Sequence, residues 1–409
     1  TEDSDGQALP TKRFWSLTMQ KRTEGSSVSP LKDNGKLITD AKGKAELLNH
    51  QFTSVFSPKE DISDEEFTTR SQMPARDDDL PRCSDIVITL PGVVKLLLSL
   101  DPKKACGPDG ISPRILKEAA VEIGPALTLL FQSSLHRGIV PADWRSAFIT
   151  PIFKKGERYK PENYRPISLT SIPCKLMEHI VVSAVMGFVE EQNILCSEQH
   201  GFRKAHSCES QLIGFVDEAS EALERGNQED VLIMDFSKAF DKVSHALLIH
   251  KLRRYGIDGR INTWIQSFLA NRQQAVVVGG MRSEFAPVES GVPQGSVLGP
   301  SLFLLYINDL PNNLESKARL FADDTACHKD VADSEDQRQM QQDLDKLAQW
   351  EDRWKMAFHP EKCSTLHMTR RRTTLTGNYI LHDHQLQSVA SAKYLGVTMT
   401  SDLKWDTHI

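Results

Sequence analysis

Two adjacent acids inside an apolar run are the feature that most constrains how this chain can fold. Asp323 and Asp324 interrupt the apolar stretch of residues 320–325. Side chains of neighbouring residues on a continuous strand point to opposite faces of a sheet. A carboxylate that is buried alone is costly unless it is paired or bound to a metal. The pair therefore indicates either the tip of a hairpin, where at least one acid points into a cleft, or an exposed turn.

A third acid, Asp235, lies at the end of a second apolar run. Residues 231–236 form a short segment that is typical of a fully buried strand. If Asp235 meets Asp323 and Asp324 in the fold, the three carboxylates make an oxygen-only site that suits Mg²⁺ better than zinc or copper. Two such ions about 3.5–4 Å apart can hold the attacking and leaving oxygens of a phosphoryl transfer.

Length and composition set broad limits. The 409 residues, of which 39% are hydrophobic, allow two or three domains or one large domain with subdomains. No apolar run approaches the 18 or more residues that indicate a membrane span. The seven cysteines are scattered without a C-x-x-C pair, which favours a reducing compartment over a disulfide framework. Because the chain begins with Thr1 and shows no signal-peptide pattern, we expect a fragment or degraded copy of a longer protein that is not secreted.

The charge is unevenly distributed along the chain. The net charge of −6 argues against a nucleic-acid partner, yet residues 145–175 contain seven bases against two acids. A polyanion could bind that stretch in a protein that is acidic overall, although a solvated charged face also accounts for it. Residues 58–79 carry eight acids against three bases, which is typical of a linker or mobile loop.

Hydrophobic spacing and turn residues predict both helices and strands. Strands at 147–153 and 164–169 should form a basic hairpin, in which Pro166 confines the second strand to a sheet edge or a bulge. Strands at 275–279 and 285–289 could also pair. The helices that we expect are 42–56, 93–98, 112–118, 125–136, 175–191, 210–225, 246–255, 262–269, 302–309 and 333–354, and the residues from 358 onward should be short strands with turns.

Taken together, the motifs resemble the reverse transcriptase domain of non-LTR (LINE-type) retrotransposons. They match in order along nearly the whole chain. The GPDG stretch and the QGFR-type loop favour the non-LTR branch over retroviruses, whose domain lacks both. The stretches that carry the resemblance are KKACGPDGI, ITPIFKKG, NYRPISLTS, QHGFRKAHS, IMDFSKAFDKVSH, SGVPQGSVLGPSLFLLYINDL, RLFADDT, HPEKC and YLGV.

The resemblance implies an α+β fold shaped like a right hand. Residues 1–80 would be an N-terminal extension and acidic linker, and residues 81–230 the fingers. Residues 231–370 would be the palm, an antiparallel sheet backed by helices. Residues 371–409 would hold the primer-grip region and the truncated start of a thumb that is largely missing.

The resemblance also implies an RNA-directed DNA polymerase that transfers dNTPs to a primer 3′ hydroxyl. Asp235, Asp323 and Asp324 match the aspartates that hold two Mg²⁺ ions, with Mn²⁺ as a possible substitute, and the backbone carbonyl of Phe236 would be an added ligand. Lys362 resembles the lysine that protonates the leaving pyrophosphate; a solvated surface lysine is the alternative.

Further residues match the nucleotide site of the family. Phe240 lies where an aromatic side chain excludes the ribose 2′-OH, although it could simply be a core residue. Gln294 and Gly295 belong to a loop that would lie against the nascent base pair, since glycine permits close approach and an amide both donates and accepts hydrogen bonds. Arg165 and Lys155 on the basic hairpin match residues that contact the triphosphate, with Lys154 ranked below them.

Two other groups would contact nucleic acid. Gly201, Phe202 and Arg203 would either contact the template or brace the fingers. Tyr394, Leu395 and Gly396 resemble the primer-grip hairpin. Asp241 is expected to be structural, capping the helix that follows, and the histidines 206, 245 and 359 have no ligand partners at metal-binding spacing, so we expect packing or surface roles for them.

The expected partners are an RNA template, a DNA primer or target, and dNTPs, with no membrane. An endonuclease would lie on another part of a longer polyprotein, and the family's life cycle suggests the nucleus and cytoplasm. Three alternatives remain open. The first is a truncated or domesticated nucleic-acid-binding protein without polymerase activity. The others are a group II intron-type maturase, whose basic maturase region is absent here, and an RNA-dependent RNA polymerase, against which the bulky Phe240 argues.

Overall fold

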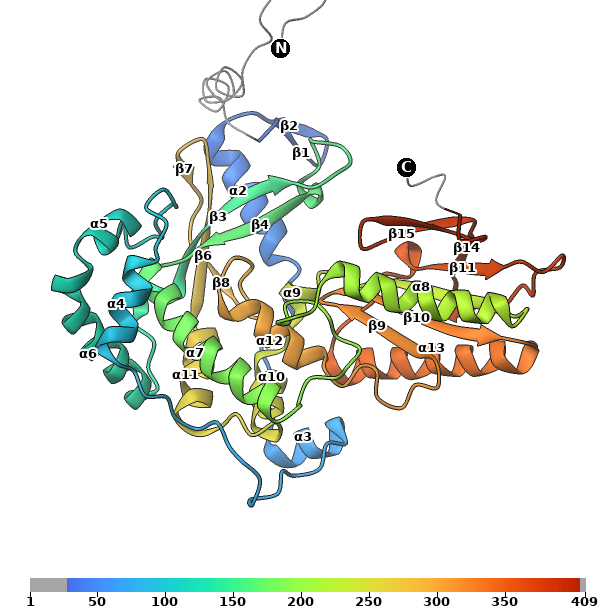
Figure 1. The fold of residues 1–409 in the computed structure, drawn as a ribbon. Helices are drawn as coiled ribbons and strands as arrows, with labels where there is room; N and C mark the ends of the chain where they lie inside the picture. The colour runs from blue at the N-terminus through green and yellow to red at the C-terminus, as the bar shows by residue number, and fades with distance from the viewer. Residues whose placement is uncertain (1–27, 405–409) are drawn as a thin grey trace, which may run out of the picture.

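The computed structural model describes residues 28–404, within which two five-stranded sheets stand side by side with helices packed around them (Figure 1). The expected mixture of helices and sheets is therefore confirmed. Residues 1–27, which belong to the expected N-terminal extension, and residues 405–409 lie outside the described part.

The first sheet contains the basic hairpin that the sequence predicts. Its strands lie in the order β4-β3-β6-β7, and β8 also pairs with β6. β3 and β4 are antiparallel, whereas β3 and β6 are parallel. β4 lies at the edge of the sheet, where a strand that contains Pro166 is tolerated. The strands are β3 (Ser146–Phe153), β4 (Tyr164–Leu169), β6 (Arg272–Val278), β7 (Met281–Arg282) and β8 (Ala286–Val288).

Helix α2 (Ala41–Thr53) packs against the first sheet. Asp40 caps it by accepting a hydrogen bond from the Gly43 N–H. Leu48 and Phe52 form one apolar core with strand residues of the sheet such as Val276. A small hairpin of β1 (Leu31–Asp33) and β2 (Lys36–Ile38) precedes this helix.

A group of helices shares one apolar core that continues into the second sheet. Val93 of α4, Val181 of α7, Phe268 of α11 and Leu302 of α12 belong to the same buried cluster as Leu232 of the second sheet. This shared core connects the two sheets. The helices are α3 (Asp64–Ser71), α4 (Leu90–Leu98), α5 (Pro113–Glu118), α6 (Ala120–Arg137), α7 (Ile172–Glu191), α9 (Ala239–Lys242), α10 (His245–Arg254), α11 (Gly259–Leu269) and α12 (Leu298–Ile307), with 3-10 turns at η1 (Ala142–Arg145) and η2 (Pro161–Asn163).

The second sheet carries the acidic motifs. Its strands lie in the order β14-β11-β5-β10-β9. β5 is antiparallel to both of its neighbours, as expected, and only the edge strand β14 is parallel to the strand beside it. The strands are β5 (Gln228–Asp235), β9 (Lys317–Phe321), β10 (Asp324–Val331), β11 (Ser364–Thr369) and β14 (Gln387–Val389).

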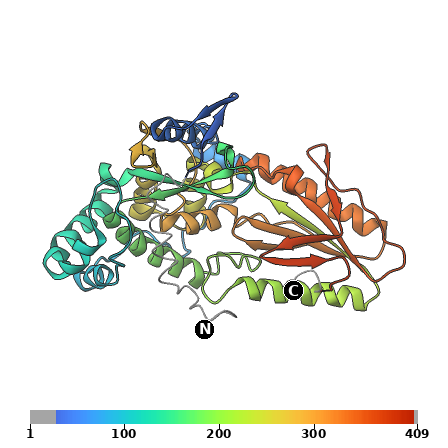
Figure 2. The ribbon, with the colours of Figure 1, turned by 90° about the horizontal axis from the view of Figure 1, so that it is seen from above.

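Two long helices cover the two faces of the second sheet. Helix α8 (Cys208–Glu224) and helix α13 (Ser334–Trp354) lie on opposite sides of it (Figure 2). Side chains alternate between the faces, so Val231 packs with Phe215 of α8, whereas Leu232 shares a core with Leu344 of α13. Both faces of β5 are therefore buried, which explains its nearly continuous apolar sequence.

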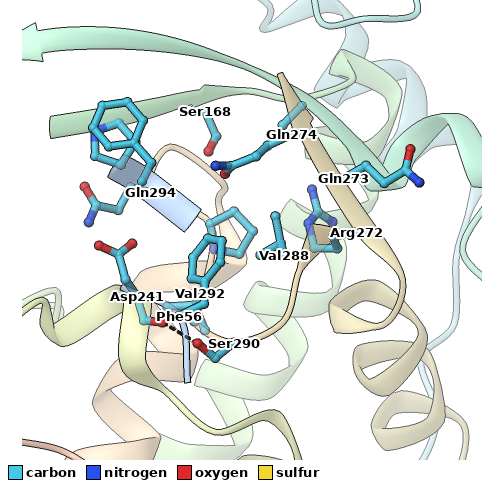
Figure 3. Close-up of a pocket in the computed structure, with 15 residues that line it drawn as sticks. Phe56, Ser168, Asp241, Arg272, Gln273, Gln274, Val288, Ser290, Val292 and Gln294 are labelled. Carbon is cyan, nitrogen blue, oxygen red and sulfur yellow. Dashed lines mark hydrogen bonds between the residues drawn. The ribbon is translucent and has the colours of Figure 1, made fainter. Parts of the chain in front are cut away.

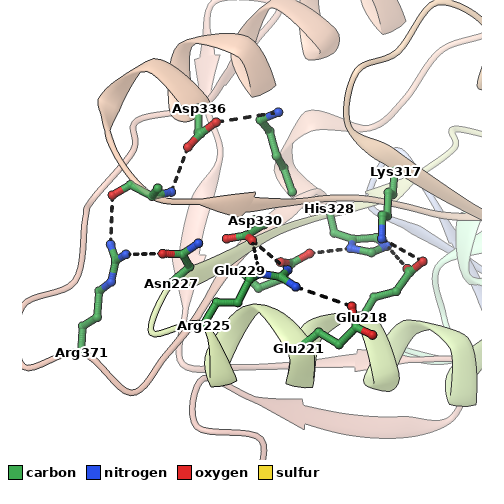
Figure 4. Close-up of polar contacts among 12 residues, drawn as sticks. Glu218, Glu221, Arg225, Asn227, Glu229, Lys317, His328, Asp330, Asp336 and Arg371 are labelled. Carbon is green, nitrogen blue, oxygen red and sulfur yellow. Dashed lines mark hydrogen bonds and ion pairs between the residues drawn. The ribbon is translucent and has the colours of Figure 1, made fainter.

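Ion pairs tie α8 to the second sheet (Figure 4). Glu218 lies 3.0 Å from the Lys317 ammonium and 3.3 Å from the ring of the buried His328. Towards the end of the same helix, Arg225 lies 2.8 Å from Asp330 of β10. These contacts hold the helix along β9 and β10.

Asp241 does not cap the helix that follows it. It lies inside the short α9, and the N-cap of α10 is Ser244, whose hydroxyl accepts from the Leu247 N–H. Ser244 lies immediately before the first helical residue, where a capping hydroxyl reaches the free N–H groups of the first turn. The capping prediction for Asp241 is therefore wrong.

Helix α7 is long and apolar enough to cross a membrane by length and composition alone. Lys175 and Glu178 interrupt its apolar sequence, so the sequence alone did not indicate a membrane span. Half of the most apolar part of this helix is buried inside the protein, and its Glu178 is fully buried among the core helices. These features are those of a core helix.

The chain passes back and forth between the two sheets. β6 belongs to the first sheet although it follows β5 of the second, and α8 packs on the second sheet although it precedes β5. A boundary at residues 230 and 231 falls inside β5. A single cut in the sequence therefore does not separate the two halves. The chain closes with η3 (Pro360–Lys362), β12 (Ile380–Leu381), β13 (His384–Gln385), β15 (Ser391–Tyr394) and β16 (Val397–Thr400).

Candidate active site

Asp235 and Asp324 face each other across two paired strands. In the antiparallel pairing of β5 and β10, the two residues are direct partners. Side chains in such a position share one face of the sheet, with Cβ atoms about 4.5–5.5 Å apart. Asp323 lies in the turn between β9 and β10, one residue before this pair. The two acids of the turn are thus at a hairpin tip, and the distant Asp235 meets them there.

The electrostatics of the three acids show mutual repulsion. The pKa of Asp324 is raised, first by reduced hydration and then by the charges of Asp323 and Asp235. The pKa of Asp323 is also raised, mainly by reduced hydration. Lys154 and Arg165 act in the opposite direction on both carboxyl groups. Solvent reaches both side chains, but enough protein surrounds them to weaken their hydration.

The basic hairpin contributes two of the cations that surround these carboxylates. Arg165 pairs with Ile152 across the β3–β4 ladder, so their side chains point to the same face of the sheet. Lys154 comes two residues after Ile152 and therefore points to that face as well. Reduced hydration and the charge of Arg165 lower the pKa of Lys154, while Asp235 raises it. Lys155, the next residue along, is not among the main groups that shift the pKa of Asp323 or Asp324. The geometry therefore favours Lys154 over Lys155 as the lysine that faces the acids.

The segment around η3 supports Asp235. The His359 N–H donates to the Asp235 carbonyl at 2.8 Å, and the Asp235 N–H points to the Cys363 sulfur at 3.5 Å. The Lys362 ammonium lies 3.4 Å from the Asp235 carboxylate, with about half of each side chain exposed. Phe236 turns its ring to the other face, where it stacks on Phe358. Lys362 therefore lies beside Asp235, where its motif predicts a lysine near the acids.

The loop of residues 290–296 is bonded to both halves of the site. The Val292 N–H donates to the Phe240 carbonyl at 2.8 Å, and the Gln294 carbonyl accepts from the Ser168 N–H of β4 at 2.7 Å. Gly291 and Gly295 have φ of +85° and +105°, and an added Cβ at either would lie 2.7 Å from backbone oxygen. Glycine is therefore required here by the neighbouring backbone, a reason that the sequence did not reveal.

Gln294 belongs to this loop and lines a pocket, whereas Phe240 directly precedes the pocket residue Asp241. Phe240 is half-buried, and its ring stacks on Phe303 of α12 with 4.4 Å between centroids. Gln294 and Asp241 line the pocket from one side and Arg272 lies across it (Figure 3). Burial raises the pKa of Asp241 to about 6. Asp235, Asp323 and Asp324 do not line this pocket.

The predicted 201–203 group divides into different roles. The Arg203 guanidinium makes two hydrogen bonds with Glu190 of α7, at 2.9 and 3.1 Å, and one with the Cys196 carbonyl. Arg203 therefore braces the loop. Phe202 is 58% exposed, so its ring is free to meet a partner. Gly201 packs on the acidic hairpin tip, with no room for a side chain against Ala322.

Residues 394–396 form the tip of the β15–β16 hairpin. Leu395 and Gly396 both have positive φ, 46° and 89°, as the two-residue turn of a tight hairpin requires. Tyr394 is buried against Phe215, and its hydroxyl donates to the Arg319 carbonyl. Tyr394 thus anchors the hairpin to the second sheet, and the turn at Leu395 and Gly396 is the part of the hairpin that faces outward.

Two of the histidines expected to have packing or surface roles, His245 and His206, bond to backbone carbonyls. His245 contacts the Gly291 carbonyl at 2.7 Å, and burial lowers the pKa of its ring to about 4. His206 contacts the Lys204 carbonyl. The His359 ring is near the site but bonds to nothing through its Nδ1 atom in the described chain.

The acids offer a donor set that suits a hard divalent cation, although their side chains do not converge on a point. Within residues 28–404, no three His, Cys, Asp or Glu side chains lie close enough together to hold an ion. The donors themselves are carboxylate oxygens, which Mg²⁺ prefers. The raised pKa values of Asp323 and Asp324 mean that a cation beside these two carboxylates would relieve repulsion.

Comparison with known proteins agrees with these features. Residues 152–399 match the sequence model of the family described as reverse transcriptase (RNA-dependent DNA polymerase). The chain is 32% identical over 337 residues to the RNA-directed DNA polymerase from mobile element jockey of Drosophila melanogaster, an alignment that covers 79% of this chain and 36% of the relative. It is 28% identical to the probable RNA-directed DNA polymerase from transposon X-element of the same species, over 98% of this chain and 44% of the relative.

A more distant relative is the Pol polyprotein from the type-1 retrotransposable element R2 of Popillia japonica. It is 30% identical over 45% of this chain and 26% of the relative. The chain spans about a third of the length of the jockey relative that it matches.

Proposed function

The chain belongs to the reverse transcriptase (RNA-dependent DNA polymerase) family, and we propose that it extends a primer 3′ hydroxyl with dNTPs on an RNA template. The observation that carries this proposal is the direct pairing of Asp235 with Asp324, next to Asp323 in the adjoining turn. The relatives' names, which refer to RNA-directed DNA polymerases of mobile elements, support the choice of template and product.

Asp235, Asp323 and Asp324 would hold two Mg²⁺ ions, or Mn²⁺ in their place, with the Phe236 carbonyl as an added ligand. When bound, the metal would supply stabilisation of the charge that develops on the attacking and leaving oxygens. The hard oxygen donors and the raised pKa values of Asp323 and Asp324 support this assignment.

The cations around the acids would bind the triphosphate. Arg165 offers a forked set of donors, and Lys154 on the same side of the hairpin adds a point charge. Lys155 would contribute less than Lys154. Lys362 would give a proton to the departing pyrophosphate; its ammonium lies 3.4 Å from the Asp235 carboxylate, which supports this role.

Phe240 and the loop of residues 290–296 would form the nucleotide pocket. Phe240 would exclude the ribose 2′-OH, and its stacking on Phe303 supports this role because a stacked ring keeps a fixed orientation. Gln294 and Gly295 would lie under the nascent base pair. The backbone bonds of this loop, from Gln294 to Ser168 of the hairpin and from Val292 to Phe240, would keep it rigid.

We further propose a right-hand arrangement. The first sheet and helices α4–α7 would act as fingers, and the second sheet with α8 and α13 as the palm. The turn at Leu395 and Gly396 would position the primer, and the exposed Phe202 would meet the template strand. A thumb and an endonuclease remain predictions for other parts of a longer polyprotein, as does a location in the nucleus and cytoplasm.

Primer extension on poly(rA)/oligo(dT) tests the proposal. We expect incorporation of dTTP that requires Mg²⁺ and stops when EDTA is added. Binding of the primed template without any extension would instead favour a nucleic-acid-binding protein that has lost the activity. Preference for UTP over dTTP would favour an RNA-dependent RNA polymerase, and RNA splicing would favour a maturase.

A further inference from the structure

The loop around Gly201, which the sequence predicts either to contact the template or to brace the fingers, lies along the edge strand of the acidic hairpin. The Leu320 N–H donates to the Glu198 carbonyl at 3.0 Å, and the Leu320 carbonyl accepts from the His200 N–H at 2.9 Å. Both backbone groups of Leu320 are thus bonded to residues 198–200. Leu320 lies three residues before Asp323, so the loop holds the strand that leads into the acidic turn.

The Gln199 side chain reaches the turn itself. Its Oε1 atom accepts two backbone N–H groups, from Gly201 at 2.7 Å and from Ala322 at 3.0 Å. Ala322 directly precedes Asp323 and has a φ of +55°, in the left-handed region that residues other than glycine rarely adopt. The amide oxygen therefore stabilises an unfavourable backbone conformation at the residue before a proposed metal ligand.

The loop is itself anchored on the helical core. Arg203 makes its paired hydrogen bonds with Glu190 of α7 and a further one with the Gln199 carbonyl at 3.3 Å. At the other end, a Cβ on Gly201 would lie 2.4 Å from the Ala322 nitrogen. Contacts therefore run without a break from α7, through Arg203 and Gln199, to the turn that holds Asp323.

The Nε2 atom of Gln199 indicates that this residue was not selected for stability alone. Gln199 is 1% exposed, and its Nε2 atom has no hydrogen-bond partner in the described chain. A buried donor without a partner costs about 1–3 kcal/mol. Stability alone does not explain a glutamine at this position, because its buried and unpaired Nε2 group destabilises the fold. What the side chain supplies is an acceptor for two N–H groups at the turn.

We propose that Gln199 is a positioning residue that fixes Asp323 for catalysis by holding the Ala322 N–H. The proposal rests on the proposed function, because it assigns Asp323 to metal binding. It differs from both roles expected for this loop, contact with the template and bracing of the fingers, because it makes Gln199 act on the turn that holds Asp323.

The test compares two variants at Gln199 with a matched control. Gln199→Met keeps the size but removes the acceptor, and Gln199→Glu keeps an oxygen that can accept both N–H groups. The control is Gln228→Met. Gln228 is also fully buried and also accepts a loop N–H, that of Leu375 at 3.0 Å, but it lies at the opposite end of β5 from Asp235. Seven residues of strand put it roughly 23 Å away.

Four quantities are measured on each variant: kcat and KM for dTTP, the Mg²⁺ concentration for half-maximal activity, the thermal unfolding midpoint, and amide hydrogen exchange of residues 320–324. For Gln199→Met we expect kcat to fall by about 10- to 100-fold, as misplacement of a catalytic group predicts. We also expect a higher Mg²⁺ requirement, faster exchange at residues 320–324 and a KM within about twofold of wild type. Gln199→Glu should recover part of kcat.

Gln228→Met should lower the unfolding midpoint at least as much while kcat and the Mg²⁺ requirement stay within about twofold of wild type. The proposal is overturned if Gln199→Met and Gln228→Met lose activity only in proportion to their loss of stability. It is also overturned if Gln199→Met leaves the exchange of residues 320–324 unchanged. If the wild-type chain does not extend primers, the proposed function fails. In that case hydrogen exchange and Mn²⁺ binding followed by electron paramagnetic resonance still decide whether Gln199 fixes the turn and its metal affinity.

Discussion

At the residue scale, the three acids are held in a costly arrangement. Asp324 faces Asp235 across the strands and follows Asp323 directly, and the pKa values of Asp323 and Asp324 are raised. A folded protein gains nothing from carboxylates that repel one another. Their cost makes sense if the group that they surround is a cation supplied from outside, so each acid should matter more for activity than for folding.

Asp324→Asn should abolish primer extension, reducing the rate by well over about 100-fold, since even changes to residues behind a metal ligand cost 10- to 100-fold. The unfolding free energy should stay the same or rise by less than about 1 kcal/mol, because a repulsive charge is removed. Extension assays and urea unfolding measure the two effects. Asp330→Asn, on the same strand but paired with Arg225, is the control and should keep its activity. An active Asp324→Asn enzyme would remove this residue from the metal site.

Phe240→Ala should admit ribonucleotides. Loss of the ring removes the group that would contact the 2′-OH, and the ratio of UTP to dTTP incorporation should rise by at least about 10-fold, corresponding to about 1.4 kcal/mol. Competition between the two nucleotides on poly(rA)/oligo(dT) measures this ratio. Phe303→Leu, which removes the stacking partner but keeps Phe240, serves as the control for packing. If both variants lose stability and neither changes the ratio, Phe240 is a core residue only.

Single residues were predictable from the sequence where a motif fixes them and not where contacts do. The resemblance of the motifs predicted that Asp235 lies beside Asp323 and Asp324, whereas the apolar runs alone left this open; in the structure Asp235 pairs with Asp324. Gln199 was overlooked because a buried glutamine leaves no periodic signal, and its role appears only when its amide oxygen is seen to accept the Ala322 N–H. The roles of Lys154 and Lys155 depend on strand register, which adjacent lysines in a sequence do not reveal.

At the scale of elements, the β3–β4 hairpin makes a prediction about side-chain direction. Lys154 shares a side with Arg165, and these two cations, unlike Lys155, are among the main charges that lower the pKa values of Asp323 and Asp324. Lys154→Ala and Arg165→Ala should each raise the KM for dNTP by about 10-fold or more, since a hydrogen bond to a charged group is worth about 1.5–3 kcal/mol. Lys155→Ala, the matched control, should change KM less than about threefold. Steady-state kinetics measure all three, and a larger effect at Lys155 would reverse the assignment.

The elements themselves were largely predictable. The hairpin with Pro166 on its edge strand, the buried strand before Asp235 and the long helix before Trp354 all follow from period and turn residues. The pairing of β3 with β6 was not predictable, because parallel strands more than a hundred residues apart leave no local pattern. The cap of α10 was misassigned because two candidate residues, Asp241 and Ser244, precede the same helix.

At the scale of the whole molecule, divalent cations should stabilise the fold in a pH-dependent manner. A ligand that binds only the folded state at ten times its Kd adds about 1.4 kcal/mol. The pKa values of Asp323 and Asp324 are raised from 3.8, so without metal these groups favour folding at low pH and that contribution is lost as pH rises. Mg²⁺ should offset the loss, because it competes with protons for the same oxygens.

The thermal unfolding midpoint with and without Mg²⁺, measured at intervals from pH 4.5 to pH 8, checks this expectation. The increase caused by Mg²⁺ should grow as pH rises and should disappear in a variant that carries both Asp235→Asn and Asp324→Asn. An increase of the same size at every pH, or one that survives in the double variant, would mean that the ion binds elsewhere.

The parallel pairing of β3 with β6 has a consequence for biosynthesis. Residue 153, at the end of β3, leaves the ribosome long before residue 278, at the end of β6. All the residues between them, including β5, also leave the ribosome before β6 is complete. The β3–β4 hairpin must therefore wait with one side uncovered until the later strand arrives. Nascent chains stalled before residue 272 should resist proteases far less in this region than chains stalled well beyond residue 278.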